Sequence, residues 1–366
     1  MEITIVGWYG TETLGDRAIL DGIFYLLEKA YGHCHIRLGS LKPFLTERTL
    51  WEDIEFYKQS APNISVEIFD VREEKNIKEA VVLSEMVIMG GGPLMDIDEM
   101  HIIEWVFSYA KRKKKKTILM GCGYGPINTE EFKGCFTRII DNTDLVIFRD
   151  EFSKENAIRS NPKRTDMVSL PDPAIFSVLN YKKRSCVEKN DNIVVNFREY
   201  PNVYGEAGAN YFKDILNELE QLDRKIQLVP MHTFFWGGDD RHFFSQLMYE
   251  NKYKNVEILS NPLSLQEVYK LYENAYGCVG MRYHSILFQT ILNGNNLLID
   301  YSGKQGKIQG FLDMYDKGEF YRERLIGNIV DKDEIQCVVR KLFENEKFSF
   351  ALEYYYEAEY MKKLKE

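Results

Sequence analysis

The sequence predicts an α/β fold made of two Rossmann-like domains. Short apolar runs typical of buried strands end in glycine-rich turns, and each turn is followed by apolar residues at helical spacing. The clearest of these runs are residues 3–6, 86–89 and 117–120. The chain has 366 residues, which is too long for one ordinary hydrophobic core and suits two domains.

A polar, basic stretch over 181–191 interrupts this pattern, and a new buried strand begins at residue 193. We therefore interpret 181–191 as a linker between domains. We expect a first domain over 1–180, a second over 191–345, and a C-terminal helix over 346–366 that packs back on the first domain.

The composition is that of an ordinary globular protein, with 45% hydrophobic and 28% charged residues. The formal net charge of −9 argues against general nucleic-acid binding. The six cysteines are widely spaced without a CxxC motif, which favours buried thiols in a reducing compartment and no zinc site. No apolar run reaches membrane-spanning length, and the N-terminus is strand-like rather than a signal sequence. We expect a cytoplasmic protein.

The first strand leads into a loop over residues 7–16 that contains Gly15 and Asp16. Its glycines do not follow the GxGxxG spacing of dinucleotide-binding loops, so a nicotinamide cofactor is not indicated. Asp16 lies near the start of the next helix, where it either caps that helix or contacts an acceptor.

Further loops follow the next three strands. Gly91 and Gly92 come after the second of the clear strands, with Asp96 just beyond, and Gly123 follows the third. Another strand ends at Phe148 and is followed directly by Arg149. Glycines permit close backbone approach to a ligand, although they also serve sharp turns. Because parallel strands end at one edge, we expect these loops to share a rim.

The second domain carries its most distinctive motif at Gly280-Met281-Arg282-Tyr283-His284-Ser285, between a short strand and a helix. The helix start attracts anions, and Arg282 and His284 add donors. Lys304 follows the next strand and adds a cation. The alternative is a capped helix with a core histidine and a surface arginine. Earlier in this domain, His232 follows a strand end from which it could reach the cleft. Asp240 and Arg241 are interpreted as structural pairing residues.

A basic run, Lys111 to Lys116, ends a predicted helix. Its simplest role is a solvated helix end that favours the helix dipole, and contact with anionic lipid headgroups is a secondary interpretation. The tail from residue 334 onward has a helical pattern, and we expect it to pack against the first domain.

These loops and motifs, in this order over residues 3–315, resemble the polysaccharide pyruvyl transferase family. The matching pieces are Gly7-Trp8-Tyr9-Gly10 through Gly15-Asp16-Arg17-Ala18-Ile19-Leu20, Ile88 to Asp96, Gly121 to Pro126, Phe148 to Ser153, Asp172-Pro173-Ala174, Gly280 to Ser285 and Tyr301-Ser302-Gly303-Lys304. The chain departs from the family pattern at Thr11 to Thr13, Arg17 and Pro93, so the acceptor stays open.

The resemblance implies a fold like that of GT-B glycosyltransferases, with two Rossmann-like domains facing a cleft. It implies transfer of the pyruvyl group of phosphoenolpyruvate onto a sugar as a cyclic ketal, with no cofactor or metal. The implied catalytic residues are His284 as acid/base, Arg149 and Lys304; the implied substrate-binding residues are Arg282, Ser285, Gly91, Gly92, Gly15, Asp16, Asp96 and Gly123.

The expected partners are phosphoenolpyruvate and a saccharide acceptor that is free, nucleotide-linked or lipid-linked at the membrane. Two other functions stay open. A GT-B glycosyltransferase would bind a nucleotide sugar, and a non-catalytic saccharide-binding subunit would not need the imidazole of His284.

Overall fold

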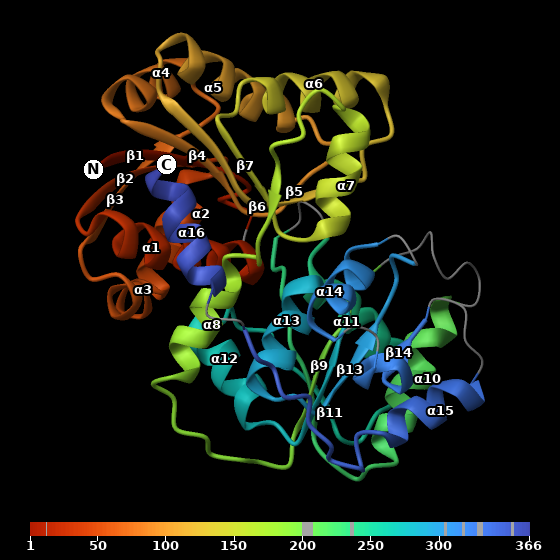
Figure 1. Cartoon of the computed structure of the whole chain (residues 1–366). Helices are drawn as coiled ribbons and strands as arrows, with labels where there is room; N and C mark the ends of the chain where they lie inside the picture. Colours follow the sequence, from red (N-terminus) through yellow and green to blue (C-terminus); the bar gives the residue numbers. More distant parts are fainter. Residues whose placement is uncertain are drawn as a thin grey trace. The chain divides into compact units, whose positions relative to one another are not determined.

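The computed structural model describes residues 1–11, 13–199, 208–234, 238–303, 306–316, 319–327, 332–352 and 355–366. The chain divides into two compact units. Unit 1 contains residues 1–177 and 352–366, and unit 2 contains residues 178–351. Each unit is an α/β domain with its own parallel sheet (Figure 1).

The sheet of unit 1 has the strand order β3-β2-β1-β4-β6-β7-β8, with the short β5 paired to β6. All pairings are parallel. From β1 the chain builds outward to β3, then returns to the other side of β1 to start β4. The strands are β1 (Glu2–Val6), β2 (Cys34–Ser40), β3 (Ile64–Asp70), β4 (Met86–Gly90), β5 (Pro93–Leu94), β6 (Lys116–Tyr124), β7 (Leu145–Phe148) and β8 (Val168–Ser169).

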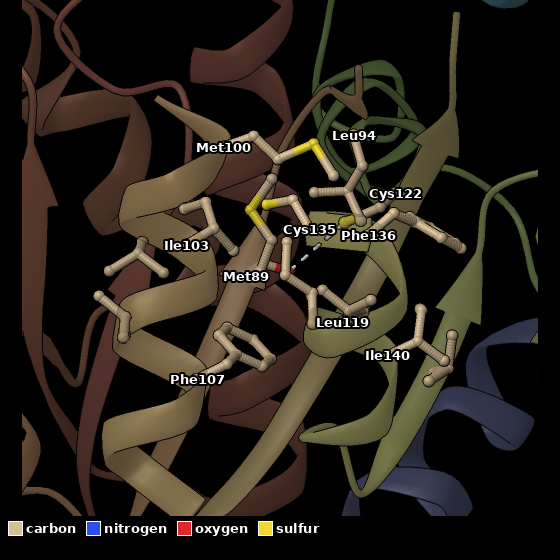
Figure 2. Close-up of a cluster of buried hydrophobic side chains, with 14 of the residues drawn as sticks. Met89, Leu94, Met100, Ile103, Phe107, Leu119, Cys122, Cys135, Phe136 and Ile140 are labelled. Atoms are coloured by element: carbon tan, nitrogen blue, oxygen red, sulfur yellow. Dashed lines mark hydrogen bonds between the residues drawn. The ribbon is translucent and has the colours of Figure 1, made fainter. Parts of the chain in front are cut away.

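Helices cover both faces of this sheet (Figure 1). On one face α4, α5 and α6 pack over the sheet and enclose a core that contains Met89, Phe107, Leu119 and Phe136, shown in Figure 2. The helices of unit 1 are α1 (Leu14–Tyr31), α2 (Pro43–Glu52), α3 (Ile54–Ser60), α4 (Glu74–Leu83), α5 (Met100–Arg112), α6 (Glu130–Asp141), α7 (Glu151–Ser160), the start of α8 (Ala174–Lys182) and α16 (Tyr355–Lys365).

The C-terminal helix α16 packs back on unit 1, as the sequence predicts. Its Glu357 accepts a hydrogen bond from the Tyr25 hydroxyl of α1 at 3.2 Å. The buried Tyr360 hydroxyl donates to the Pro171 carbonyl at 2.7 Å. The tail is not one continuous helix, however, because α15 (Lys332–Arg340) belongs to unit 2 and is followed by residues 341–352, which are not helical.

Unit 2 repeats the topology of unit 1 with the order β11-β10-β9-β12-β13-β14. Its strands are β9 (Ile193–Asn196), β10 (Ile226–Leu228), β11 (Val256–Ile258), β12 (Gly277–Gly280), β13 (Asn296–Ile299) and β14 (Leu325–Ile326). Its helices are α10 (Gly208–Glu220), α11 (Asp240–Glu250), α12 (Leu265–Asn274), α13 (Tyr283–Leu292), α14 (Lys307–Tyr315), α15 and the 3-10 helix η2 (Phe320–Glu323). This pair of Rossmann-like sheets confirms the predicted fold class.

Each sheet has one place where the strand order reverses, and ligands of open α/β sheets bind beyond the strand ends at that place. In unit 1 the reversal lies between β1 and β4, and in unit 2 between β9 and β12. Among the helices of the described ranges, none has the length and apolar character to cross a bilayer.

Candidate functional site

The reversal point of unit 2 holds the motif that the sequence singles out. Arg282 is the N-cap residue of α13 and follows β12 directly. Its backbone N–H donates to the Asn196 side-chain oxygen at 3.1 Å, and Asn196 is the last residue of β9. Asn196 is fully buried and donates in turn to the Val229 carbonyl at 3.0 Å. These bonds fix the turn that places Arg282 and His284 beyond the sheet edge.

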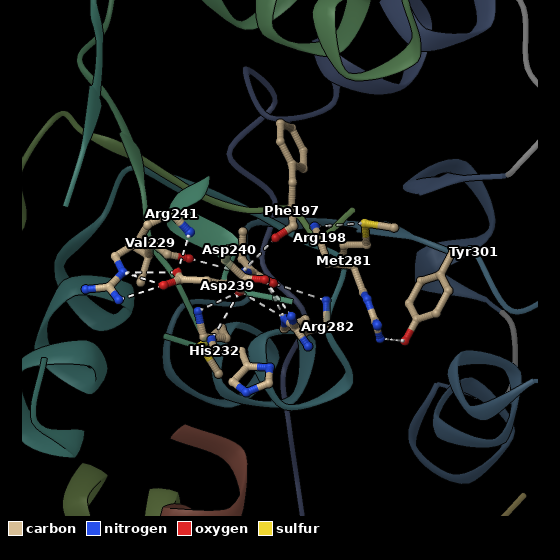
Figure 3. Close-up of polar contacts among 12 residues, drawn as sticks. Phe197, Arg198, Val229, His232, Asp239, Asp240, Arg241, Met281, Arg282 and Tyr301 are labelled. Carbon is tan, nitrogen blue, oxygen red and sulfur yellow. Dashed lines mark hydrogen bonds and ion pairs between the residues drawn. The ribbon is translucent and has the colours of Figure 1, made fainter. Parts of the chain in front are cut away.

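Arg282 is held by a buried carboxylate, that of Asp240 at the start of α11 (Figure 3). The Arg282 Nε lies 2.9 and 3.1 Å from the two Asp240 oxygens. Asp240 Oδ2 also accepts the backbone N–H groups of Met231 and His232, at 3.0 and 3.1 Å. Asp240 therefore fixes the guanidinium in one orientation.

The structure refines the interpretation of Asp240 and Arg241 as structural pairing residues. They do not pair with each other: Asp240 pairs with Arg282, and Arg241 pairs with Asp239, the N-cap residue of α11. His232 follows β10, as predicted, but is only 5% exposed.

His284 is the second residue of α13 and is half-buried. Its ring contacts those of Tyr283 and Phe288, with centroids 5.2 and 6.2 Å apart. Arg282 at the N-cap makes no side-chain hydrogen bond to the helix, so the first-turn N–H groups of α13 gain no partner from the capping side chain. Such a helix start favours an anion beside the imidazole.

Of two further predicted site residues, the structure describes Ser285 but not Lys304. Ser285 is fully buried, and its hydroxyl bonds to the Tyr272 hydroxyl at 2.9 Å and to Gln289 Nε2 at 2.8 Å. These contacts hold α13 against α12 and give Ser285 a positioning role. Lys304 lies outside the described residues.

Sequence reasoning missed a cluster of cations around the buried Tyr301. Arg198 follows β9, and its Nη1 lies 3.5 Å from the Tyr301 hydroxyl (Figure 3). The Arg198 guanidinium carbon and Lys307 Nζ lie 5.4 and 5.2 Å from the centre of the Tyr301 ring. The signal was available, because Phe197-Arg198 repeats the strand-end pattern of Phe148-Arg149.

This cluster perturbs the phenol strongly. Burial alone would raise the pKa of Tyr301, but the positive charges of Lys307, Arg198 and Arg282 outweigh it and lower the pKa to about 8. The three cations thus create a positive potential at the Tyr301 hydroxyl. Two or more cations at the reversal point of a Rossmann-like sheet are suited to a phosphate or carboxylate.

We predict that Tyr301 ionises about two pH units below the usual tyrosine pKa of about 10. The phenolate form is favoured in the folded protein, so its stabilising contribution is present above pH 10 and is lost as pH falls through 8. Ultraviolet absorbance at the phenolate band should show one early titration, and Tyr301→Phe should abolish it. An unchanged early titration in that variant would contradict the assignment.

The remaining predicted residues lie in unit 1. Gly15 and Asp16 belong to the first turn of α1, and the N-cap residue is Thr13 rather than Asp16. The Thr13 hydroxyl accepts the Asp16 backbone N–H at 3.2 Å and also donates to the Asp16 carboxylate. Asp16 lines a small recess together with aromatic and hydroxyl side chains of Trp8, Thr11, Thr13, Thr49 and Tyr57.

The glycine loop after β4 is occupied by side chains of the protein itself. A β-carbon on Gly92 would lie 2.3 Å from Trp8 Cδ1, and one on Gly91 would lie 3.6 Å from Asp16 Oδ1. Both glycines have positive φ, +66° and +102°. Trp8 Nε1 donates to the Pro93 carbonyl at 3.0 Å. The glycines therefore allow the loop after β1 to pack closely on the loop after β4.

Arg149 lies buried at the end of β7 with 4% of its side chain exposed. Its nitrogens lie 3.4 Å from Asp150 and 3.7 Å from Asp172. Gly123 is the residue that admits it, because a β-carbon there would lie 2.8 Å from Arg149 Nη2. Gly123 and Arg149, which the sequence analysis names separately, thus lie together within unit 1.

Asp96 joins two of the loops at the same sheet edge. Its Oδ2 accepts the Asn128 N–H at 2.8 Å, and its own N–H donates to the Pro126 carbonyl at 3.0 Å. Its Oδ1 is buried and has no hydrogen-bond partner among the residues that the structure describes. A buried carboxylate oxygen without a partner is costly, and a hydroxyl donor would satisfy it.

Comparisons with known proteins place this geometry in context. The chain is similar in fold to a UDP-GlcNAc 2-epimerase from Methanocaldococcus jannaschii, with a TM-score of 0.61, 14% identity, and 96% and 95% of the two chains covered. It is also similar to a UDP-N-acetylglucosamine 2-epimerase from Rickettsia bellii (TM-score 0.60, 13% identity, 99% and 94% covered) and to Anabaena HepE, solved in complex with UDP and glucose (TM-score 0.54, 10% identity, 100% and 98% covered). At these identities the likeness shows the GT-B-like fold alone.

A search of curated proteins finds no sequence match. The pattern of one family, described as polysaccharide pyruvyl transferase, matches residues 14–303, which is more than half of the chain. The matched span leaves out the residues before residue 14 and those from α14 onward. It includes the other described residues at both reversal points. The chain therefore belongs to the polysaccharide pyruvyl transferase family, a family of transferases that modify polysaccharides.

Proposed function

We propose that this protein transfers the pyruvyl group of phosphoenolpyruvate onto a sugar of a polysaccharide or its precursor, forming a cyclic ketal and releasing phosphate. The observation that carries the proposal is the cation cluster at the reversal point of unit 2, where Arg198, Arg282 and Lys307 lie around Tyr301. His284 follows Arg282 in the first turn of α13. A donor with a phosphate and a carboxylate matches several cations on one rim.

Arg282 and the start of α13 would hold one anionic group of the donor, and Arg198 with Lys307 the other. The orientation imposed by Asp240 suits this role, since a fixed guanidinium loses little freedom when the donor binds. Lys304, outside the described residues, and Arg149 of unit 1 stay predicted contributors. Arg198, Arg282 and Lys307 of unit 2 would also stabilise the charge of the departing phosphate.

The reaction needs balanced proton transfers. The methylene carbon C3 of the enol takes a proton, which leaves an oxocarbenium-like centre at C2, and one acceptor hydroxyl bonds to C2 and releases its proton. The bond from C2 to the phosphate oxygen then breaks, a second hydroxyl closes the ketal, and its proton leaves with phosphate. His284 is the proposed acid and base, because imidazole exchanges protons near neutral pH.

Family membership implies a saccharide acceptor, which residues of unit 1 would bind. The recess beside Asp16 offers an aromatic face, hydroxyls and a carboxylate, which is the chemistry that binds sugars. Asp96, with a buried oxygen that lacks a partner among the described residues, is a second candidate to orient a sugar hydroxyl.

Calorimetric titration with phosphoenolpyruvate tests the donor, with inorganic phosphate and uridine diphosphate titrated separately. We expect phosphoenolpyruvate to bind more tightly than phosphate, and Arg198→Gln and Lys307→Gln each to weaken it about tenfold or more. A bound anion should also raise the pKa of Tyr301 from about 8 towards its usual value. Arg224→Gln, which removes a cation from a part of unit 2 remote in sequence from both loops, is the matched control.

The two alternatives give different results. Tight binding of uridine diphosphate with no response to phosphoenolpyruvate would make the protein a nucleotide-sugar glycosyltransferase. Binding of phosphoenolpyruvate without any turnover on saccharide acceptors would leave a non-catalytic binding subunit.

A further inference from the structure

The end of α5 carries a cationic turn that the proposed chemistry does not use. Lys111 to Lys116, here called the basic turn, leads from α5 into β6. It lies at the edge where the strands begin, whereas the loops of the candidate site lie at the edge where they end. Lys111 forms an ion pair with Asp144, and Lys116 donates to the Leu364 carbonyl at 3.1 Å. Arg112, Lys113 and Lys114 are exposed in a chain whose net charge is −9.

The backbone of the basic turn holds Lys114 in a conformation that is unusual for lysine. The Lys115 N–H donates to the Ala110 carbonyl and the Lys114 N–H to the Lys111 carbonyl, at 3.0 and 2.9 Å. This pair of bonds is a Schellman motif, and it places Lys114 in the left-handed region at φ +58°.

Glycine is the favoured residue at that position, and lysine is strained there. The chain places glycine at the left-handed residue after α1, Gly32, and again after α13, Gly294. The other left-handed residues without glycine in the described ranges are Asp223 and Asn345, types that tolerate this conformation. Helix-dipole stabilisation does not require Lys114, because Lys111, Arg112 and Lys113 already lie at the helix end. The chain therefore keeps a strained lysine at position 114, although the helix does not need the charge of that residue.

Exposed apolar side chains lie next to Lys115 of the basic turn. Val82 and Leu83 end α4 with 48% and 51% of their surface exposed. Lys115 Nζ donates to the Val82 carbonyl at 2.9 Å, which joins the two helix ends. Arg112 and Lys113 lie over the Tyr109 ring at 5.6 and 5.4 Å from its centre. Cations next to exposed apolar residues match an anionic lipid surface better than a nucleic acid, which offers no apolar phase.

We propose that the basic turn, with Val82 and Leu83, docks this protein on an anionic membrane surface. Arg112, Lys113 and Lys114 would lie among the lipid headgroups, and the two apolar side chains would enter the boundary with the acyl chains. The proposal holds whichever donor unit 2 binds, since no residue of the candidate site takes part.

Vesicle co-sedimentation tests the docking, with phosphatidylcholine vesicles and with the same vesicles containing phosphatidylglycerol. We expect binding to the anionic vesicles alone, weakened by salt. Lys114→Gly should lower the binding constant roughly fivefold, the contribution of one cation near such a surface. The same substitution should raise the melting temperature by about 2 °C, because it relieves the left-handed strain.

Matched variants separate charge from strain. Asp223→Gly places glycine at another left-handed residue, in unit 2, and should leave vesicle binding unchanged. Val82→Ser with Leu83→Ser should weaken binding at fixed charge. The triple change Lys252→Gln, Lys254→Gln and Lys270→Gln removes exposed cations elsewhere and should have no effect.

Three outcomes would overturn the proposal: no preference for anionic vesicles, equal binding by Lys114→Gly, or binding that the serine variants leave intact while an oligonucleotide competes. The last result would assign the basic turn to a polyanion other than a membrane. Loss of phosphoenolpyruvate binding alone would affect only the proposed function.

Discussion

Replacing His284 by alanine is expected to lower turnover of phosphoenolpyruvate by about 10²- to 10⁴-fold, the range of lost acid–base catalysis. Donor affinity should stay within a few-fold of its original value, because the anion-binding groups, Arg198, Arg282 and Lys307, are unchanged. The loss should therefore fall on kcat and not on the dissociation constant. Phosphate release measured under saturating donor, together with calorimetry, separates the two.

The environment of His284 supports this division of roles. The ring is half-buried between Tyr283 and Phe288, so its removal leaves the helix start and its first-turn N–H groups in place. His242→Ala is the matched control, since His242 is exposed on α11 and its ring contacts the Gln246 side chain. Turnover that survives in His284→Ala would remove this imidazole from the chemistry, and an equal loss in His242→Ala would indicate a general effect on folding.

Sequence reasoning reached the fold because its signals are local. Each buried strand is a short apolar run, each is followed by a loop and a helix, and the restart near residue 193 marks the second sheet. The turn at Arg282 and His284 could be placed for the same reason. Strand, turn and helix start are adjacent in sequence, so their geometry follows from spacing alone.

The partners of these residues could not be predicted in the same way. Asp240 meets Arg282 across 42 residues, and Arg198 meets Tyr301 across 103. Such pairs arise because parallel strands bring their ends to one edge, a property of the sheet order and not of any local pattern. For Gly91 and Gly92, the local conformation could be predicted but the neighbouring side chains could not. Their freedom was foreseen, but Trp8 and Asp16 lie where a ligand was expected.

Removing the Asp240 carboxylate is expected to destabilise unit 2 by about 3–5 kcal/mol in Asp240→Ala. The side chain is 1% exposed, and its loss leaves the Arg282 charge without this partner and deprives the Met231 and His232 N–H groups of an acceptor. Urea unfolding followed by circular dichroism measures the effect. Asp239→Ala is the matched control, because Asp239 is the neighbouring residue with an arginine partner in a more exposed setting, and it should cost only about 1 kcal/mol as a lost helix cap.

Asp240→Asn distinguishes the charge from the hydrogen bonds. The amide keeps an oxygen for the two backbone N–H groups, so part of the lost stability should return, while the fixed orientation of Arg282 should not. A buried ion pair is a poor source of stability, since desolvation offsets much of its attraction. If the ion pair serves to orient the Arg282 guanidinium, the Asp240→Asn variant should fold but bind phosphoenolpyruvate more weakly than the original protein. Equal or tighter donor binding in that variant would show that Asp240 mainly reduces the positive charge of Arg282, and the positioning role would have to be abandoned.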